Sequence, residues 1–305
     1  MTREGVTSQE IPVSFLCSED RLYGILHRPA QASACGVLIV TGRPALRAGR
    51  HRLFVLLARA WAEARIPVMR FDFRGTGDCE GEMGTLEETS EDIGSAVDAF
   101  MANMPGLERV VLWGLCGGAA DSVLYAARDP RIAGIAMVNP WTYDTQVKAL
   151  SKLSQYGSNG WEKIRRVAEQ ITSLKKSGAE GAAAGVDNGF ESAGGRDFSS
   201  PHQNAAVNRA YSSYRVPDLS KRLVESLEKF DGKILLILSG RDTGSRAFKH
   251  AASISPRWRR LLSSRRVQCR ELPDSNHSLR RPEWRAQAAA WTIEWLRASA
   301  VEKSP

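Results

Sequence analysis

Five short apolar runs recur along the chain, with segments of helical periodicity between them. The runs are GVLIVT at 36–41, PVMRFDF at 67–73, RVVLWG at 109–114, IAGIAMVN at 132–139 and KILLILSG at 233–240. Continuous apolar runs of this length are typical of strands buried on both faces of a mostly parallel sheet. Because parallel strands are joined by crossovers that usually contain a helix, the alternation predicts the α/β class, with a mostly parallel, doubly wound sheet.

The flanking segments predict further strands and the helices. Residues 10–17 and 21–28 indicate two strands joined by a polar turn, and RRVQCREL at 265–272 indicates the last strand. Apolar residues recur at helical spacing in 51–65, in 89–104 and after Cys116. Near the C-terminus, Trp284, Ala288, Trp291 and Trp295 share one helix face, which we interpret as core packing.

Residues 141–226 interrupt this alternation, and we predict that they form an insertion in a core made of residues 1–140 and 227–305. Residues 144–175 are amphipathic, which favours helix. The composition of residues 177–201, rich in Gly, Ala, Ser and Asn, favours disorder. Insertions at this point of an α/β fold commonly cover the functional site, so we expect a lid.

The segment Gly114–Gly118, GLCGG, follows one apolar run and precedes a helical stripe. A nucleophile elbow has this strand–turn–helix context and a glycine on each side of its central residues. Glycine tolerates the sharp turn, and the following helix N-terminus favours a thiolate. We therefore predict that Cys116 is a nucleophile. The alternative is a plain turn with a buried structural cysteine.

Two residues follow Cys116 in the order that the acid and the base take after such an elbow. Asp242 lies just past KILLIL, where a carboxylate would orient an imidazole and stabilise its charged form. His277 lies in a polar loop after the last predicted strand, where it can act as general base and then as general acid. Asp144 is a competing acid, which we rank below Asp242.

The segment Thr41–Pro44, TGRP, follows the first apolar run and is the candidate oxyanion loop. Backbone N–H groups of Arg43 and Gly117 would together bind the developing negative charge. The Arg43 guanidinium would either contact an anionic substrate or form a surface salt bridge, and the sequence leaves both open.

These motifs resemble those of a known family. The run RFDFRGTGDCEG at 70–81 resembles the DxRGxGxS loop of many α/β hydrolases, with Cys79 in place of the usual serine. More narrowly, the elbow and the segment Val138–Trp141 resemble the type 1 exosortase A system-associated hydrolases, bacterial proteins encoded beside exopolysaccharide and protein-sorting genes. The resemblance covers most of the chain outside 145–225. It implies the α/β-hydrolase fold with a cysteine nucleophile and the triad Cys116, Asp242 and His277. A weaker similarity to dienelactone hydrolases rests on the cysteine.

A cysteine nucleophile forms a thioester with the acyl group, so we predict hydrolysis of esters or thioesters through a covalent intermediate. The first alternative is an acyltransferase that passes the acyl group to an alcohol or amine, from a small molecule, coenzyme A or an acidic carrier protein. The second is a non-catalytic hydrolase-fold protein that binds a ligand or partner. The acyl group and the oligomeric state are not encoded in these motifs.

Composition excludes several other classes. The net charge of +8 owes much to late arginines, but no nucleic-acid motif accompanies them, so we interpret them as a solvated surface. No apolar run is long enough to cross a membrane, and the polar N-terminus does not resemble a signal peptide. The five cysteines include no CxxC pair and no metal-ligand spacing, so we expect no metal, no cofactor and a reducing cytoplasm.

Overall fold

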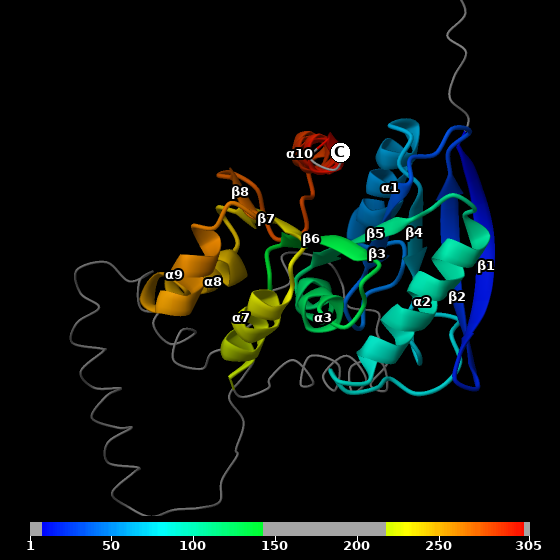
Figure 1. Cartoon of the computed structure of the whole chain (residues 1–305), viewed down its shortest axis with the longest axis horizontal. Helices are drawn as coiled ribbons and strands as arrows, with labels where there is room; N and C mark the ends of the chain where they lie inside the picture. The colour runs from blue at the N-terminus through cyan, green and yellow to red at the C-terminus, as the bar shows by residue number, and fades with distance from the viewer. Residues whose placement is uncertain (1–7, 143–217, 302–305) are drawn as a thin grey trace, which may run out of the picture.

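The computed structural model describes residues 8–142 and 218–301, and its centre is an eight-stranded sheet (Figure 1). The strand order is β1-β2-β4-β3-β5-β6-β7-β8. Strands β1, β2 and β4 pair antiparallel, and the other neighbours pair parallel, which confirms the predicted mostly parallel sheet. The strands are β1 (Gln9–Cys17), β2 (Asp20–Arg28), β3 (Cys35–Val40), β4 (Val68–Phe71), β5 (Arg109–Leu115), β6 (Ile132–Val138), β7 (Lys233–Ser239) and β8 (Val267–Leu272).

Helices cover both faces of the sheet. One face carries α1 (Leu53–Glu63), which a 3-10 turn (Arg50–Arg52) precedes, and α10 (Pro282–Val301). The other carries α2 (Thr89–Asn103), α3 (Gly117–Ala126), α7 (Leu219–Lys229), α8 (Thr243–Ile254) and α9 (Pro256–Leu262). Because successive side chains of a strand point to opposite faces, Leu38 and Val40 of β3 join the core under α2 and α3, while Val37 and Ile39 join the core under α1 and α10. The sheet is therefore buried on both sides, as its apolar runs predict.

The predicted elements lie where the sequence placed them, with additions in the second half of the chain. Helices α8 and α9 were not among the predicted elements. Helix α7 begins at Leu219, inside the segment predicted as an insertion, and its apolar face packs into the core beside α3 and α9. Most of the predicted lid, residues 143–217, lies outside the described residues, with the helix at 144–175 and the disorder at 177–201, and all three stay predictions.

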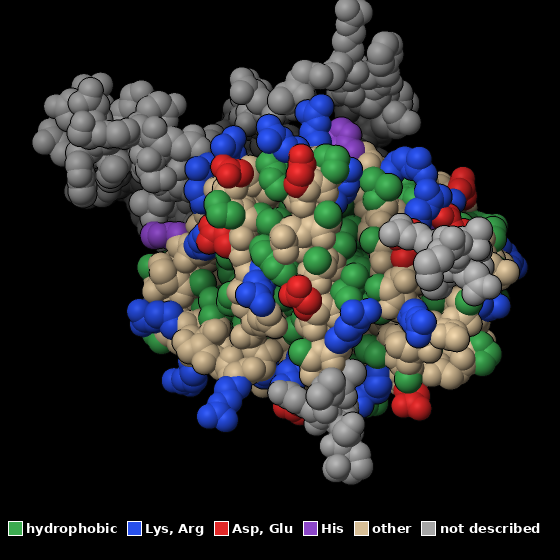
Figure 2. Space-filling model, turned by 90° about the horizontal axis from the view of Figure 1, so that it is seen from above, with side chains coloured by type: hydrophobic (Ala, Val, Ile, Leu, Met, Phe, Trp, Pro, Cys, Tyr) green, Lys and Arg blue, Asp and Glu red, His purple; other side chains and the backbone are tan. Residues whose placement is uncertain are grey.

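Several late arginines bind other parts of the fold. Arg257 forms ion pairs with Glu225 and Glu228 of α7, and Arg266 donates to carbonyl oxygens at the end of the same helix, with 2.6 Å to Leu227 O. Lys and Arg side chains are scattered over the face shown in Figure 2, with Asp and Glu among them. Part of the basic excess thus holds α7 against α9 and β8.

A buried basic cluster lies on β2 and β4. His27 is fully buried and accepts a hydrogen bond at Nε2 from Arg70 Nε (2.9 Å), and Arg70 faces Glu10 at 3.7 Å. Burial and the nearby Arg70 charge lower the pKa of His27 to about 4, against the opposing effect of Glu10. The imidazole is therefore neutral in the folded protein at neutral pH.

We expect His27 to make the fold acid-sensitive between pH 6.5 and 4. The unfolded chain binds a proton at this histidine near pH 6.5 and the folded chain only near pH 4. The contribution of neutral His27 to the free energy of unfolding is thus fully present above about pH 6.5. It is lost as the pH falls towards 4, by roughly 3 kcal/mol. Urea unfolding at pH 7 and pH 4.5 should show a smaller acid loss in His27→Gln, which keeps an acceptor for Arg70. The control His250→Gln, at an exposed position, should lose as much as wild type. Equal losses in all three proteins would contradict the assignment.

Candidate active site

Cys116 lies in the turn between β5 and α3, at the carboxyl end of a strand inside the sheet. Its φ of 59° and ψ of −116° cost a non-glycine residue about 1–3 kcal/mol. The Cys116 N–H donates to Val138 O at the end of β6 (2.9 Å), and its carbonyl oxygen accepts from Trp141 N (3.2 Å). The turn therefore has the strained conformation that the glycine-flanked motif predicts.

Three glycines let the backbone segments around this turn meet. A Cβ atom on Gly114 would lie 2.3 Å from the backbone of Gly118, and one on Gly118 would lie 2.1 Å from Val40 O. A Cβ on Gly42, whose φ is 70°, would lie 2.3 Å from Gly118 N. The loop after β3 consequently packs directly on the N-terminus of α3. This contact makes the backbone segments that carry Arg43 and Gly117 neighbours.

The Arg43 side chain points into the protein. Its Nη2 lies 3.8 Å from Asp121 Oδ1 of α3, both side chains are nearly inaccessible, and its Nη1 donates to Gly84 O. The expectation of a surface salt bridge is therefore wrong, because the ion pair is buried. Substrate contact by the guanidinium is not supported either, since only 1% of that side chain is exposed.

Asp242 and His277 come together at the ends of β7 and β8. Asp242 Oδ1 lies 3.1 Å from His277 Nδ1, while Oδ2 accepts from the N–H of Ser245 (2.8 Å) and lies 3.1 Å from its hydroxyl oxygen. Asp242 thus caps the N-terminus of α8 with one oxygen and contacts the histidine with the other. Burial alone would raise the pKa of Asp242, but His277 and Ser245 together hold it below its usual range.

His277 contacts Asp242, and the Cys116 sulfur lies near the same ring. Burial alone would lower its pKa, but the hydrogen bond to Asp242 and the nearby Cys116 sulfur and Asp242 carboxylate raise the pKa of His277 to about 10. The side chain keeps 42% of its surface exposed. The structure therefore brings Asp242 and His277 together, with Cys116 near the imidazole. Asp144, the competing acid, lies outside the described residues.

The other cysteines have different surroundings. Cys79 is buried, donates to Asp72 O and accepts from Tyr23 N, both at 3.2 Å, and burial raises its pKa to about 11. Cys269 is exposed on β8, where partial burial of its sulfur raises its pKa. Neither contacts a histidine in the interactions described, so the Cys116 environment is distinct from theirs.

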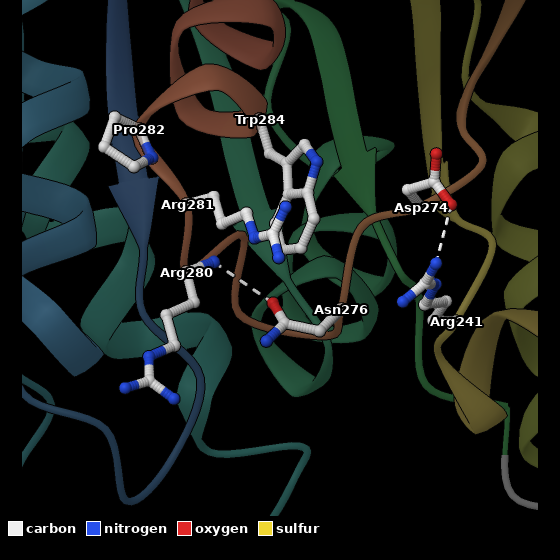
Figure 3. A pocket seen from close by; sticks show the side chains of 7 residues that line it. All are labelled: Arg241, Asp274, Asn276, Arg280, Arg281, Pro282 and Trp284. Carbon is white, nitrogen blue, oxygen red and sulfur yellow. Dashed lines mark hydrogen bonds and ion pairs between the residues drawn. The ribbon is translucent and has the colours of Figure 1, made fainter.

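A depression of about 500 Å³ adjoins the His277 loop (Figure 3). Its walls come from the loops after β7 and β8 and from the start of α10. Arg241 pairs with Asp274 at 2.9 Å, and the Arg281 guanidinium lies 5.1 Å from the Trp284 ring centre. The lining residues are Arg241, Asp274, Asn276, Arg280, Arg281, Pro282 and Trp284. The depression carries more positive than negative side chains.

Two residues of this region were not predicted as functional. Ser245 has a sequence signal, because the spacing Asp-x-x-Ser at 242–245 is that of an N-capping turn. Asn139, known from the sequence only as part of a family resemblance, contacts the His277 backbone.

Residues 8–142 and 218–301 contain neither a metal-binding cluster nor a membrane-spanning helix. No group of three or more His, Cys, Asp or Glu side chains there could hold a metal ion. Within the same ranges, no helix is long and apolar enough to cross a membrane.

A mostly parallel sheet with an elbow of positive φ, and a His–Asp pair at the ends of the following strands, is the architecture of α/β hydrolases. Residues 37–290 match the model of the alpha/beta hydrolase family, and the chain belongs to this family. A comparison with curated proteins found no match.

Solved structures agree on the fold. The Pyrococcus furiosus esterase Pf2001 is 14% identical, with a TM-score of 0.61 over 98% of this chain and 94% of that one. Est1E from Butyrivibrio proteoclasticus, solved with ferulic acid bound, is 14% identical, with a TM-score of 0.59 over 95% and 99%. GrgF, an alpha/beta hydrolase from a Penicillium species, is 17% identical, with a TM-score of 0.59 over 95% and 97%.

We expect Asp242→Asn to lower the pKa of His277 from about 10 towards its ordinary value. The asparagine still caps α8 but removes the negative charge and the acceptor that favour the imidazolium. Titration of the His277 ring resonances by NMR measures this. Asp274→Asn, a matched change at an exposed carboxylate three residues from His277, should leave the titration where it is. An unchanged titration in Asp242→Asn would show that the carboxylate does not act on the ring.

Proposed function

We propose that this chain hydrolyses ester or thioester bonds, with Cys116 as nucleophile, His277 as acid and base, and Asp242 as the group that orients His277. The observation that carries the proposal is the contact of His277 with Asp242, 3.1 Å apart, beside a strained turn whose Cys116 sulfur lies near the same imidazole. A non-catalytic binding protein has no need of this arrangement. The strained φ of Cys116 supports the same conclusion, because such strain clusters at functional sites.

In the proposed acylation step, His277 takes the proton of the Cys116 thiol, the thiolate sulfur attacks the carbonyl carbon, and the carbonyl oxygen becomes negatively charged. In this proposal the N–H groups of Arg43 and Gly117 bind this oxygen, which is supported by the close approach of the loop after β3 to the N-terminus of α3. The tetrahedral intermediate then collapses and the bond to the leaving group breaks. His277 gives its proton to the departing oxygen or sulfur, which leaves an acyl thioester on Cys116.

In the proposed deacylation step, His277 takes a proton from water, and the hydroxide formed attacks the thioester carbonyl. The carbon–sulfur bond breaks, the acid is released and Cys116 is restored with His277 protonated. An alcohol or amine in place of water would give acyl transfer by the same steps. Product analysis with and without such acceptors distinguishes hydrolysis from transfer.

We further propose that the chain is of the type 1 exosortase A system-associated kind and works in the cytoplasm. The elbow with a central cysteine and the segment Val138–Trp141 support the first part. The reactive thiol supports the second, because a reducing compartment keeps such a group free.

We expect Cys116→Ala to abolish covalent acylation and to reduce turnover of activated esters by at least about 10⁴-fold. Incubation with a panel of acyl esters and thioesters, followed by mass spectrometry, locates any acyl group on the protein. The matched control is Cys269→Ala, since Cys269 is an exposed cysteine outside the site and its removal should leave acylation intact. Full acylation of Cys116→Ala would overturn the assignment of the nucleophile.

We also propose that the leaving group of the substrate carries an anionic phosphate, as coenzyme A and phosphopantetheine carriers do, and that the arginine depression binds it. Arg241 and Asn276 of its lining directly precede Asp242 and His277 in sequence, so the depression is built by the loops that carry the acid and the base. Guanidinium groups bind phosphate in a bidentate manner. The depression offers Arg241, Arg280 and Arg281 for this role.

We expect Arg281→Gln to raise KM for an acyl-coenzyme A by about 10-fold, the size of one lost charge-assisted hydrogen bond. The uncharged analogue, an acyl-N-acetylcysteamine thioester, should keep its KM. Arg270 is the matched control, because it also packs on a tryptophan, 5.9 Å from the ring centre of Trp291, but lies outside the depression. Arg270→Gln should leave both KM values unchanged. If Arg281→Gln raised KM for the two thioesters equally, the proposal that the depression binds phosphate would be wrong.

A further inference from the structure

Asn139 lies directly after β6, between the elbow of Cys116 and the loop of His277. Only 1% of it is exposed, and its φ of 46° is in the left-handed region, which asparagine adopts more readily than most residues. Its N–H donates to Ile237 O of β7 (3.0 Å). The backbone of Asn139 is therefore fixed against the neighbouring strand, with its side chain held at the ends of β6 and β7.

The side-chain amide of Asn139 uses its full hydrogen-bonding capacity. Nδ2 donates to Ser239 Oγ (2.9 Å) and to the carbonyl oxygen of His277 (3.0 Å). Oδ1 accepts from Ser239 N (2.8 Å) and from Ser245 Oγ (2.7 Å). An amide has two donor hydrogens and two acceptor lone pairs, so all four are occupied. The Ser239 N–H can only donate, which fixes the orientation of the amide.

These bonds join the residues that we propose as catalytic. One donor of Asn139 binds the backbone of His277, and one lone pair binds Ser245, whose hydroxyl also contacts Asp242. Two residues further on, Trp141 N donates to the Cys116 carbonyl oxygen. The short segment 139–141 therefore contacts the backbones of both the proposed base and the proposed nucleophile.

We propose that Asn139 is a positioning residue that sets the place of His277 relative to Cys116, an inference that rests on the function proposed above. His277 lies in a loop, and its side chain is far from fully enclosed. A buried amide bound to its carbonyl oxygen limits the movement of that loop. Because Ser245 joins the same amide to Asp242, one side chain fixes the base from its backbone and also from the carboxylate that orients its ring.

Asn139→Gly tests the inference, because glycine accepts the positive φ and removes only the side chain. We expect kcat for an activated ester to fall by about 100-fold, the size of effect that a displacement of about 1 Å can have. KM should stay within about threefold, since substrate contacts are unchanged. The pKa of His277, followed by NMR, should fall from about 10, because displacement weakens its contacts with Cys116 and Asp242.

The matched control is Asn103→Ala. Asn103 also donates from its amide to a backbone carbonyl, that of Ala99 in α2, but has no bond to the site. This variant should keep the wild-type kcat and His277 titration. A folded Asn139→Gly protein with both wild-type values would overturn the inference.

Ser245→Ala covers the case in which Asn139→Gly does not fold. It removes one hydroxyl from the same network, and we expect a smaller fall in kcat, of about 10-fold, with a downward shift in the His277 titration. Wild-type values in Ser245→Ala would then overturn the inference. If wild-type protein is never acylated, the proposed function fails, but the His277 titration of the variants still decides the role of Asn139.

Discussion

The site depends on a backbone contact that only glycine permits. The end of β3, the end of β5 and the first turn of α3 approach so closely at Gly114 and Gly118 that a methyl group on either residue would overlap backbone atoms. The turn at Cys116, with its positive φ, lies between these glycines, and the same approach brings the loop of Arg43 beside the helix N-terminus. The proposed nucleophile, the proposed oxyanion donors and the N-terminus of α3 thus meet at one close approach, whose strain the surrounding strands hold in place.

Around this contact, the charged groups have separate roles set by burial. The Arg43 guanidinium is buried in an ion pair with Asp121, so this residue offers the substrate side only its backbone. The exposed arginines Arg241, Arg280 and Arg281 lie instead in the depression beside the His277 loop. Under the proposed function, recognition of substrate charge would thereby be separate from the carbonyl chemistry, where a fixed cation would favour one ionic state of the substrate.

The sequence was sufficient for the sheet, the elbow and the pairing of Asp242 with His277, because each has a local signal: continuous apolar runs, flanking glycines and residue order. It was not sufficient to predict the buried ion pair of the Arg43 side chain or the hydrogen bond of Asn139 to the His277 backbone. Their roles depend on which distant residue lies opposite, Asp121 in one case and the backbone of His277 in the other. Helices α8 and α9 escaped prediction although Asp242 and Ser255 cap them, since a capping residue is informative only once a helix is suspected.

One carboxylate oxygen of Asp242 accepts a hydrogen bond at the N-terminus of α8, and the other contacts His277. The first contact supports the fold and would be selected for in any descendant of this chain, active or not. Within the part of the chain that the structure describes, the side chains of Cys116 and His277 form no comparable bond to a helix end. In a lineage that lost catalysis, the aspartate should therefore persist while the cysteine and the histidine drift. When related sequences are sorted into enzymes and inactive scaffolds, the aspartate will be a poor criterion and the cysteine–histidine pair a good one.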